Sequence, residues 1–153
     1  MAGYYFDEFE VGRVFKHPIR RTVTETDNVL FSTLTHNPAP LHIDHEYMRT
    51  SSEFGKPLMN SFFTLGLIVG ISVNDTTLGT TVANLGLTEV RFPAPLFVGD
   101  TVHVETEVVA MRPSQSRPHN GVLTLEHRGY NQHDTLVVIC RRAVLMLKAA
   151  KRP

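Results

Sequence analysis

One apolar stretch, from Phe62 to Val73, most constrains what this chain can fold into. Its length of about a dozen residues falls short of the roughly twenty that a membrane-spanning helix needs. Small residues interrupt it at Gly66, Gly70 and Ser72, and these suit close packing against a sheet. The stretch therefore predicts a buried central helix, which we expect from about Met59 to Val73.

Most of the remaining chain is predicted to form strands with one buried face, because apolar and polar residues partly alternate. The long candidates are Val82 to Phe92, Thr101 to Arg112, Gly121 to Tyr130 and Leu136 to Leu147. Two short strands, a helix through about Leu34, a loop from Asn37 to Asp44 and a helical turn from His45 to Ser51 precede them. Antiparallel strands with one hydrophobic helix laid across them make an α+β domain, and we expect residues 1–153 to form a single one.

The sheet of such a domain leaves a strand at one edge, which invites pairing with a second copy. A homodimer or higher homo-oligomer is therefore expected.

Composition argues against several classes of partner. Fifteen basic and fifteen acidic residues give a formal net charge of zero, which indicates no nucleic-acid or membrane partner. Small basic clusters, including Arg112 with Arg117, could each meet a phosphate-bearing ligand, although solvated strand ends are the commoner explanation. The single Cys140 excludes an internal disulfide and fits a reducing cytoplasm. The amino terminus lacks the basic start and apolar run of a secretory signal.

The polar segment from Thr35 to Asp44, with His42 inside it, is the strongest candidate for chemistry. Asn60 and Ser61 follow it at the expected start of the apolar helix. A histidine ring moves protons near neutral pH, and the free N–H groups of a helix start can bind a polarised carbonyl oxygen. Together these features indicate proton transfer beside a carbonyl group.

Several segments resemble the MaoC-like dehydratases, also called (R)-specific enoyl-CoA hydratases. The resemblance runs from about Phe9 to the last strand, and its motifs include Arg91-Phe92-Pro93-Ala94-Pro95 and Gly99-Asp100-Thr101. It implies the hotdog fold, an antiparallel sheet wrapped around one central helix. It also implies an enzyme that adds water across, or removes it from, the α,β bond of an acyl-CoA thioester.

The signature of that family, Asp-x-Asn-Pro-x-His-x-Asp, corresponds here to Asn37 through Asp44. The proline, the histidine and the last aspartate are kept, but Asn37 replaces the first aspartate and Ala39 replaces the internal asparagine. Because an amide cannot take up a proton, the resemblance implies that His42 is the main acid and base and that Asn37 only orients water or the ring. His36 is a possible substitute partner.

A second signature, a His-Gly pair opening the central helix, is matched in position by Asn60 and Ser61. The resemblance implies that the Ser61 backbone N–H binds the thioester oxygen as negative charge builds on it. This role needs no particular side chain. Asn60 is assigned to substrate binding.

Asn37, His42 and Asn60-Ser61 together resemble a narrower branch, the mesaconyl-CoA hydratases or β-methylmalyl-CoA dehydratases. That branch implies a branched dicarboxylic acyl-CoA, whose free carboxylate needs a cation. Arg91 and Arg117 are the assigned substrate-binding candidates, with Arg20 and His119 as alternatives.

Each of these residues also has an explanation without catalysis. Asn37 before a proline is a common turn former, Asp44 suits an N-cap for the turn at His45, and Asn60 suits a helix cap. His36, His42, Asp44 and His45 lack the spacing of a zinc site, so no metal is expected. No cofactor is expected either, because nucleotide-binding glycine loops are absent.

Two functional alternatives remain beside the hydro-lyase. One is a thioesterase, since one fold supports many reactions, although Phe62 to Val73 carries no carboxylate. The other is a non-catalytic acyl-CoA-binding protein or partner subunit, which Asn37 favours and the retained His42 disfavours.

Overall fold

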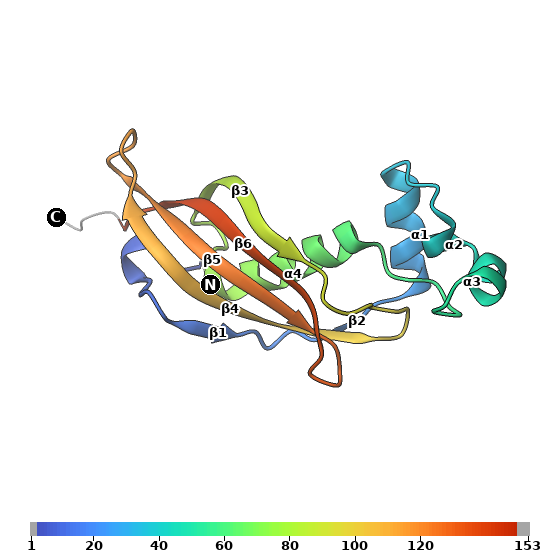
Figure 1. Ribbon diagram of the computed structural model, residues 1–153. Coiled ribbons are helices and arrows are strands. Elements are labelled where there is room, and N and C mark those ends of the chain that lie inside the picture. Colours follow the sequence, from blue (N-terminus) through green and yellow to red (C-terminus); the bar gives the residue numbers. More distant parts are fainter. Residues whose placement is uncertain (1–2, 150–153) are drawn as a thin grey trace.

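The structure, a computed structural model, describes residues 3–149. Six strands form the sheet, and every strand pair is antiparallel. The strands are β1 (Val14–Lys16), β2 (Arg21–Thr22), β3 (Thr81–Arg91), β4 (Thr101–Pro113), β5 (Asn120–Tyr130) and β6 (Leu136–Leu147). Their order across the sheet is β1-β4-β5-β6-β3, with β2 also pairing with β4 (Figure 1). The predicted α+β class is confirmed.

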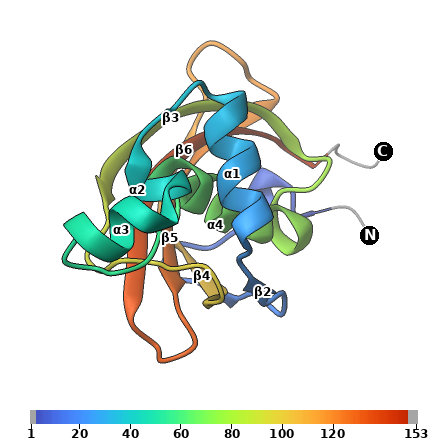
Figure 2. The ribbon, with the colours of Figure 1, turned by 90° about the vertical axis from the view of Figure 1, so that its right-hand side faces the viewer.

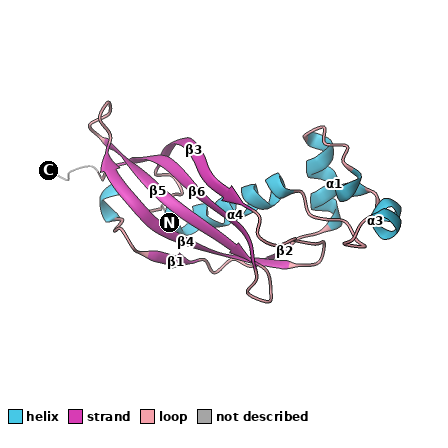
Figure 3. Cartoon of the chain, in the orientation of Figure 1, coloured by secondary structure: helices cyan, strands magenta, loops and turns pink. Residues whose placement is uncertain are grey.

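Helix α4 (Ser61–Thr76) lies along one face of this sheet and packs on β4, β5 and β6 (Figure 3). Its Ile68 and Ile71 are buried against strand residues that include Val104 and Val138. Gly129 on β5 permits this approach, because a Cβ atom there would lie 2.6 Å from a methyl group of Ile68. The apolar run is therefore the central helix that the sequence predicts.

Three further helices gather at one end of the molecule, beyond the start of α4 (Figure 2). They are α1 (Glu25–Leu34), α2 (Pro40–Ile43) and α3 (His45–Ser51), and a 3-10 turn, η1 (Phe6–Glu8), comes earlier in the chain. Thr24 caps α1 in a capping box with Asp27. No helix in residues 3–149 is long and apolar enough to cross a membrane.

Two predicted boundaries near the candidate site need correction. The predicted loop from Asn37 to Asp44 contains the short helix α2, which begins at Pro40 because proline at the first helical position is already set for a helix. The central helix begins at Ser61 rather than Met59 and continues to Thr76. Met59 instead lies in an extended segment, where its N–H donates to the Leu96 carbonyl at 2.8 Å.

Strand β3 forms one edge of the sheet, and its side chains are exposed along almost its whole length. The exposed apolar side chains include those of Val82, Leu85, Leu87 and Val90. On its other edge β3 pairs with β6, with three irregularities in register. One apolar strand edge is thus uncovered in the single chain.

Candidate functional site

His42 lies on α2 with a defined ring orientation. Its Nδ1 is 2.9 Å from the carbonyl oxygen of Leu58. Because a carbonyl oxygen only accepts, Nδ1 carries a proton and donates it in this bond. Nε2 is then the ring nitrogen left to meet a ligand, and in the neutral ring it bears the lone pair that can accept a proton.

Asn28 of α1 connects the backbone segments that carry the site, and it is fully buried. Its side-chain amide donates to the carbonyl oxygens of His42 at 2.8 Å and Leu58 at 2.9 Å. Its Oδ1 accepts the backbone N–H of Asn60 at 2.8 Å. One side chain therefore joins α1, α2 and the residue before α4, and uses all of its principal hydrogen-bonding groups inside the protein.

This residue is a positioning group that the sequence analysis did not single out. An asparagine at an interior position of a helix is an unusual choice, since asparagine favours caps and turns. That unfavourable placement at Asn28 was the available signal, but it does not say which backbone groups the amide would meet.

The start of α4 presents free backbone N–H groups. Asn60 is the N-cap, and its Oδ1 accepts the Phe62 N–H at 3.0 Å. The Asn60 carbonyl accepts the Thr64 N–H at 3.0 Å. Within the described part of the chain the Ser61 N–H has no hydrogen-bond partner. A helix start with an open N–H and a positive dipole end is suited to binding an oxygen that bears negative charge.

His42 and Ser61 line the same cavity, which has a volume of about 390 Å³. Its other walls are largely apolar and come from Leu41, Phe54, Leu58 and the segment from Phe92 to Leu96. Segments far apart in the sequence thus bring one histidine ring and one helix start to a common apolar hollow. Such a cavity with few polar groups is typical of a small-molecule site.

Asn37 and Asp44 make local contacts. The Asn37 Oδ1 accepts the Ala39 N–H at 3.1 Å, and this turn leads into α2. The Asp44 side chain accepts the Tyr47 N–H at 2.8 Å and caps α3, as the alternative explanation of this residue predicts. Neither residue is among those that line the cavity.

The structure separates the remaining candidates. The Asn60 side chain is buried, caps α4 and donates to Ser32 Oγ at 3.3 Å, so its amide faces protein groups and not the cavity. His36 is exposed, has a positive φ of 53° and does not line the cavity. Arg91 ends β3, directly before the cavity residue Phe92. Arg117 lines a different hollow.

Across residues 3–149, no three or more histidine, cysteine or acidic side chains come close enough to hold a metal ion.

Known proteins share both this sequence and this architecture. Residues 8–131 match the model of the MaoC-like domain. The chain belongs to the MaoC-like domain family. It is 30% identical over 147 residues to a mesaconyl-CoA hydratase from Cereibacter sphaeroides, and this match covers 96% of the chain and 42% of that protein. The chain spans about two fifths of the length of the curated relatives it matches first.

Solved structures of similar proteins identify the fold. A monoamine oxidase regulatory protein from Archaeoglobus superposes with a TM-score of 0.85 and 30% identity, over 98% of both chains. A Mycobacterium tuberculosis protein described as a double hotdog fold superposes with a TM-score of 0.87 at 24% identity, over 99% of this chain and 46% of that one. The MaoC-like chain has the hotdog fold that its sequence motifs imply.

Proposed function

We propose that this MaoC-like protein is a hydro-lyase that adds water to, or removes it from, the α,β bond of an acyl-CoA thioester. The observation that carries the proposal is the shared cavity of the His42 ring and the Ser61 N–H. Relatives named as mesaconyl-CoA hydratase and 3-hydroxybutyryl-CoA dehydratase support the same class of reaction.

In the hydration direction, Nε2 of neutral His42 takes a proton from a water molecule while the water oxygen bonds to the β carbon. The π electrons of the α,β bond move toward the thioester, and its oxygen gains negative charge that the Ser61 N–H stabilises. The His42 imidazolium then gives its proton to the α carbon. One water molecule has been added, and His42 is neutral again.

The Leu58 carbonyl supports this cycle, because it accepts the Nδ1–H in both charge states of the His42 ring. The Asn37 amide exchanges no proton, and because its Oδ1 accepts the Ala39 N–H and it does not line the cavity, the proposed steps leave it only the turn that leads into α2.

The proposed substrate is a branched dicarboxylic acyl-CoA of the mesaconyl-CoA or β-methylmalyl-CoA type. This follows the names of relatives that match almost the whole chain, which are mesaconyl-CoA hydratases and a β-methylmalyl-CoA dehydratase. Arg91 is the proposed partner of the free carboxylate, since it lies directly beside the cavity residue Phe92 and has no ion-pair partner within residues 3–149.

The proposed assembly is a homodimer joined through β3. Its exposed apolar side chains and unpaired strand edge are a surface that a second copy can cover in the same way.

The test is hydration of mesaconyl-CoA and crotonyl-CoA by the purified protein, followed as loss of the enoyl-thioester absorbance. His42→Ala is expected to lower kcat by about a hundredfold to ten-thousandfold, the range for a lost general acid or base. His45→Ala is the matched control, because His45 is an exposed histidine on α3 that bonds to Glu25. Equal rates for wild type and His42→Ala would contradict the assigned role.

A second candidate is a non-catalytic acyl-CoA-binding protein or partner subunit, which the Asn37 amide in the position of the family aspartate favours. In that case neither thioester is hydrated, although both still bind. Release of free CoA without hydration would instead identify a thioesterase.

A further inference from the structure

The cavity that holds His42 has a third polar side chain, which the proposed steps do not use. Of the described residues that line the cavity, only His42, Ser61 and Thr64 have polar side chains, and none has a carboxylate. Thr64 belongs to α4 and is 2% exposed. Because Thr64 lines the cavity from inside the protein, a ligand can reach it only through the cavity.

The proton of the Thr64 hydroxyl has a fixed direction. Oγ1 donates to the carbonyl oxygen of Asn60, the N-cap of α4, at 3.2 Å. Since a carbonyl oxygen only accepts, the proton points to the helix backbone, and the lone pairs of Oγ1 accept no hydrogen bond from another residue within 3–149. Threonine carries two heavy atoms on Cβ, which restricts the rotation of its side chain. The hydroxyl is therefore held in place as a hydrogen-bond acceptor.

Thr64 lies on the same side of α4 as the free N–H of Ser61. Residues three apart on a helix are neighbours on its surface, roughly 4.5 Å apart along the axis. Both residues line the cavity, so this side of the first turn faces His42. One turn of α4 thus offers a donor for the thioester oxygen and, next to it, an acceptor.

A water molecule adds efficiently to the β carbon only when its orientation is fixed. It has two protons, and its oxygen attacks with a lone pair. Nε2 of neutral His42 accepts one proton, because Nδ1 donates to the Leu58 carbonyl. Without a second acceptor the water can rotate about this single hydrogen bond. The Asn37 side chain does not supply that acceptor, since it does not line the cavity, whereas Thr64 does line it.

We propose that the Thr64 hydroxyl accepts one proton of the attacking water in a hydrogen bond while Nε2 of His42 accepts the other, so that a lone pair of the water oxygen faces the β carbon. Thr64 itself exchanges no proton. As the water adds, the proton at His42 moves to the ring, and the proton bonded to Thr64 stays on the new β-hydroxyl group. In the dehydration direction the same hydrogen bond holds the leaving hydroxyl group. This inference rests on the proposed function.

The first experiment compares wild type with Thr64→Val, which removes the hydroxyl and keeps the size and branching of the side chain. The kcat for hydration is expected to fall about tenfold to a hundredfold while KM changes less than about twofold, because the thioester keeps its contacts and only the water loses its orientation. Thr64→Ala, a second variant without the hydroxyl, is expected to show the same loss. Thr64→Ser restores the hydroxyl and is expected to recover most of kcat. A Thr64→Ser variant as slow as Thr64→Val would overturn the proposal.

Thr76→Val is the matched control on the same helix. Thr76 is fully buried, and its Oγ1 likewise donates to the carbonyl oxygen four residues earlier, that of Ser72. It does not line the cavity. Both valine variants lose the same kind of hydrogen bond, so urea titration is expected to show similar changes in the free energy of unfolding, whereas only Thr64→Val lowers kcat. An equal fall in kcat for both variants would assign the effect to packing of α4 and contradict the role of Thr64.

The other hydroxyl of the cavity is tested with Ser61→Ala, which keeps the backbone N–H. A fall in kcat for Ser61→Ala with none for Thr64→Val would assign the water to Ser61 and overturn the inference. Hydration by wild type that Thr64→Val does not slow would also overturn it, but would leave the hydro-lyase proposal intact. If wild type hydrates no thioester, the proposed function fails and this inference fails with it.

Discussion

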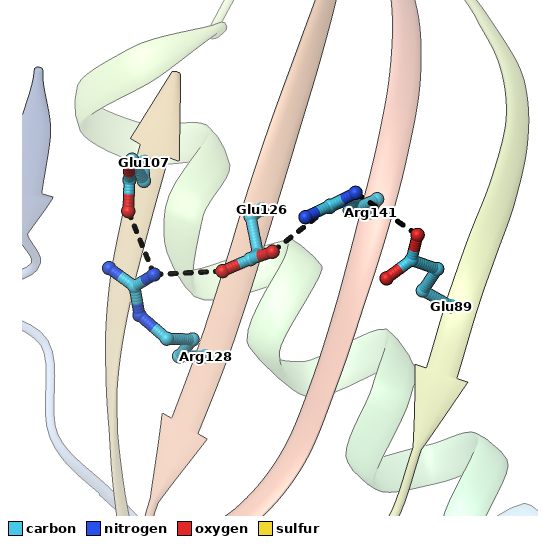
Figure 4. A network of polar contacts seen from close by, with 5 residues as sticks. All are labelled: Glu89, Glu107, Glu126, Arg128 and Arg141. Atoms are coloured by element: carbon cyan, nitrogen blue, oxygen red, sulfur yellow. Dashed lines mark hydrogen bonds and ion pairs between the residues drawn. The ribbon is translucent and has the colours of Figure 1, made fainter. Parts of the chain in front are cut away.

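The two faces of the sheet treat charged side chains differently, and two neighbouring arginines on β6 show it. Arg141 points to the outer face, away from α4, and belongs to a chain of five charged residues (Figure 4). Glu126 joins Arg141 at 3.0 Å and Arg128 at 2.9 Å, and Glu89 and Glu107 complete the two ends. Arg142 points to the α4 face, is 4% exposed, and has no carboxylate partner within residues 3–149.

The inner face holds a row of directed hydrogen bonds, although Nε and Nη2 of Arg142 and Nε2 of His127 have no hydrogen-bond partner within residues 3–149. His17 lies 2.7 Å from both Asp75 and Thr106, and Thr106 lies 2.8 Å from Nδ1 of His127. When His17 is neutral, its Nδ1–H donates to the Asp75 carboxylate and its Nε2 accepts the Thr106 hydroxyl. The Thr106 oxygen in turn accepts the Nδ1–H of His127. Nε2 of His127 therefore keeps its lone pair, in a region that also holds the Arg142 charge.

A buried polar group that loses its hydrogen-bond partner finds no replacement, whereas partly exposed ion pairs have water as an alternative partner. Asn28 of α1, which accepts the N–H of the residue before α4, resembles the inner face in this respect because it is fully buried with its amide bonded on both sides. Stability and function should accordingly respond strongly to changes at Asn28 and His127 and weakly to changes in the outer chain.

Asn28→Ala should have the largest effect. Three buried hydrogen bonds are lost, and at about 1 kcal/mol or slightly more for each the free energy of unfolding should fall by about 3 to 4 kcal/mol. The activity should also fall by about a hundredfold, since the orientation of His42 relative to Ser61 is no longer fixed. Urea titration and kcat/KM check the two effects. Asn74→Ala, at an exposed position of α4, is the control. Equal effects of the two substitutions would contradict the positioning role of the buried Asn28 amide.

His127 should dominate the response to acid. Burial, together with the nearby Arg142 charge, lowers the pKa of His127 to about 3 from its ordinary 6.5. Below pH 6.5 His127 takes up a proton in the unfolded chain but stays neutral in the folded protein, so the free energy of unfolding falls as the pH falls. Between pH 6.5 and 4 the loss from this residue should be roughly 3 kcal/mol.

His127→Asn, whose amide can still donate to Thr106, should remove that part of the pH dependence. Denaturant titrations from pH 7 to 4 measure it, with the exposed His133→Asn as the control. Parallel pH profiles for wild type and His127→Asn would show that His127 does not stay neutral inside the protein.

Arg142→Met should raise the free energy of unfolding by about 1 to 2 kcal/mol, because it removes a buried charge without a partner and keeps much of the side-chain volume. Burial also lowers the pKa of Arg142. Arg141→Met, one residue away on the outer face, should act in the opposite direction. Thermal unfolding of wild type and both variants at one fixed protein concentration shows whether each substitution stabilises or destabilises the protein. Destabilisation by Arg142→Met would contradict the interpretation of Arg142 as an uncompensated buried charge.

Glu126→Gln should have the smallest effect, about 1 kcal/mol or less. Arg128 keeps its contact with Glu107, and Arg141 keeps its contact with Glu89. The difference from wild type should shrink further in high salt, because salt screens partly exposed charges. A loss as large as that of Asn28→Ala, unaffected by salt, would erase the contrast between the two faces.

The elements that the sequence predicted well are those with a regular local signal. The apolar run from Phe62 onward indicated the central helix, alternation indicated the long strands, and Asp44 was correctly identified as a cap. The start of the central helix was less accurate, because Met59 is apolar like the helix but pairs with Leu96 instead.

The residues of the candidate site also differ in how well the sequence predicted them. Motif positions pointed to His42 and Ser61, and the structure brings these two to one cavity. They did not exclude Asn60, whose side chain is consumed in capping, or Arg117, which lies at the other hollow. They also passed over Asn28, since its partners come from three segments that meet only in the folded chain.

By itself the sequence determined the α+β class, the central helix and the family, because periodicity and short motifs act over a few neighbouring residues. Only the tertiary structure decided the tautomer of His42, the role of Asn28 and the separation of Arg141 from Arg142. Those outcomes depend on which backbone carbonyl or carboxylate arrives from a distant segment, and hydrogen bonds of less than about 3.5 Å are set by packing that no local pattern encodes.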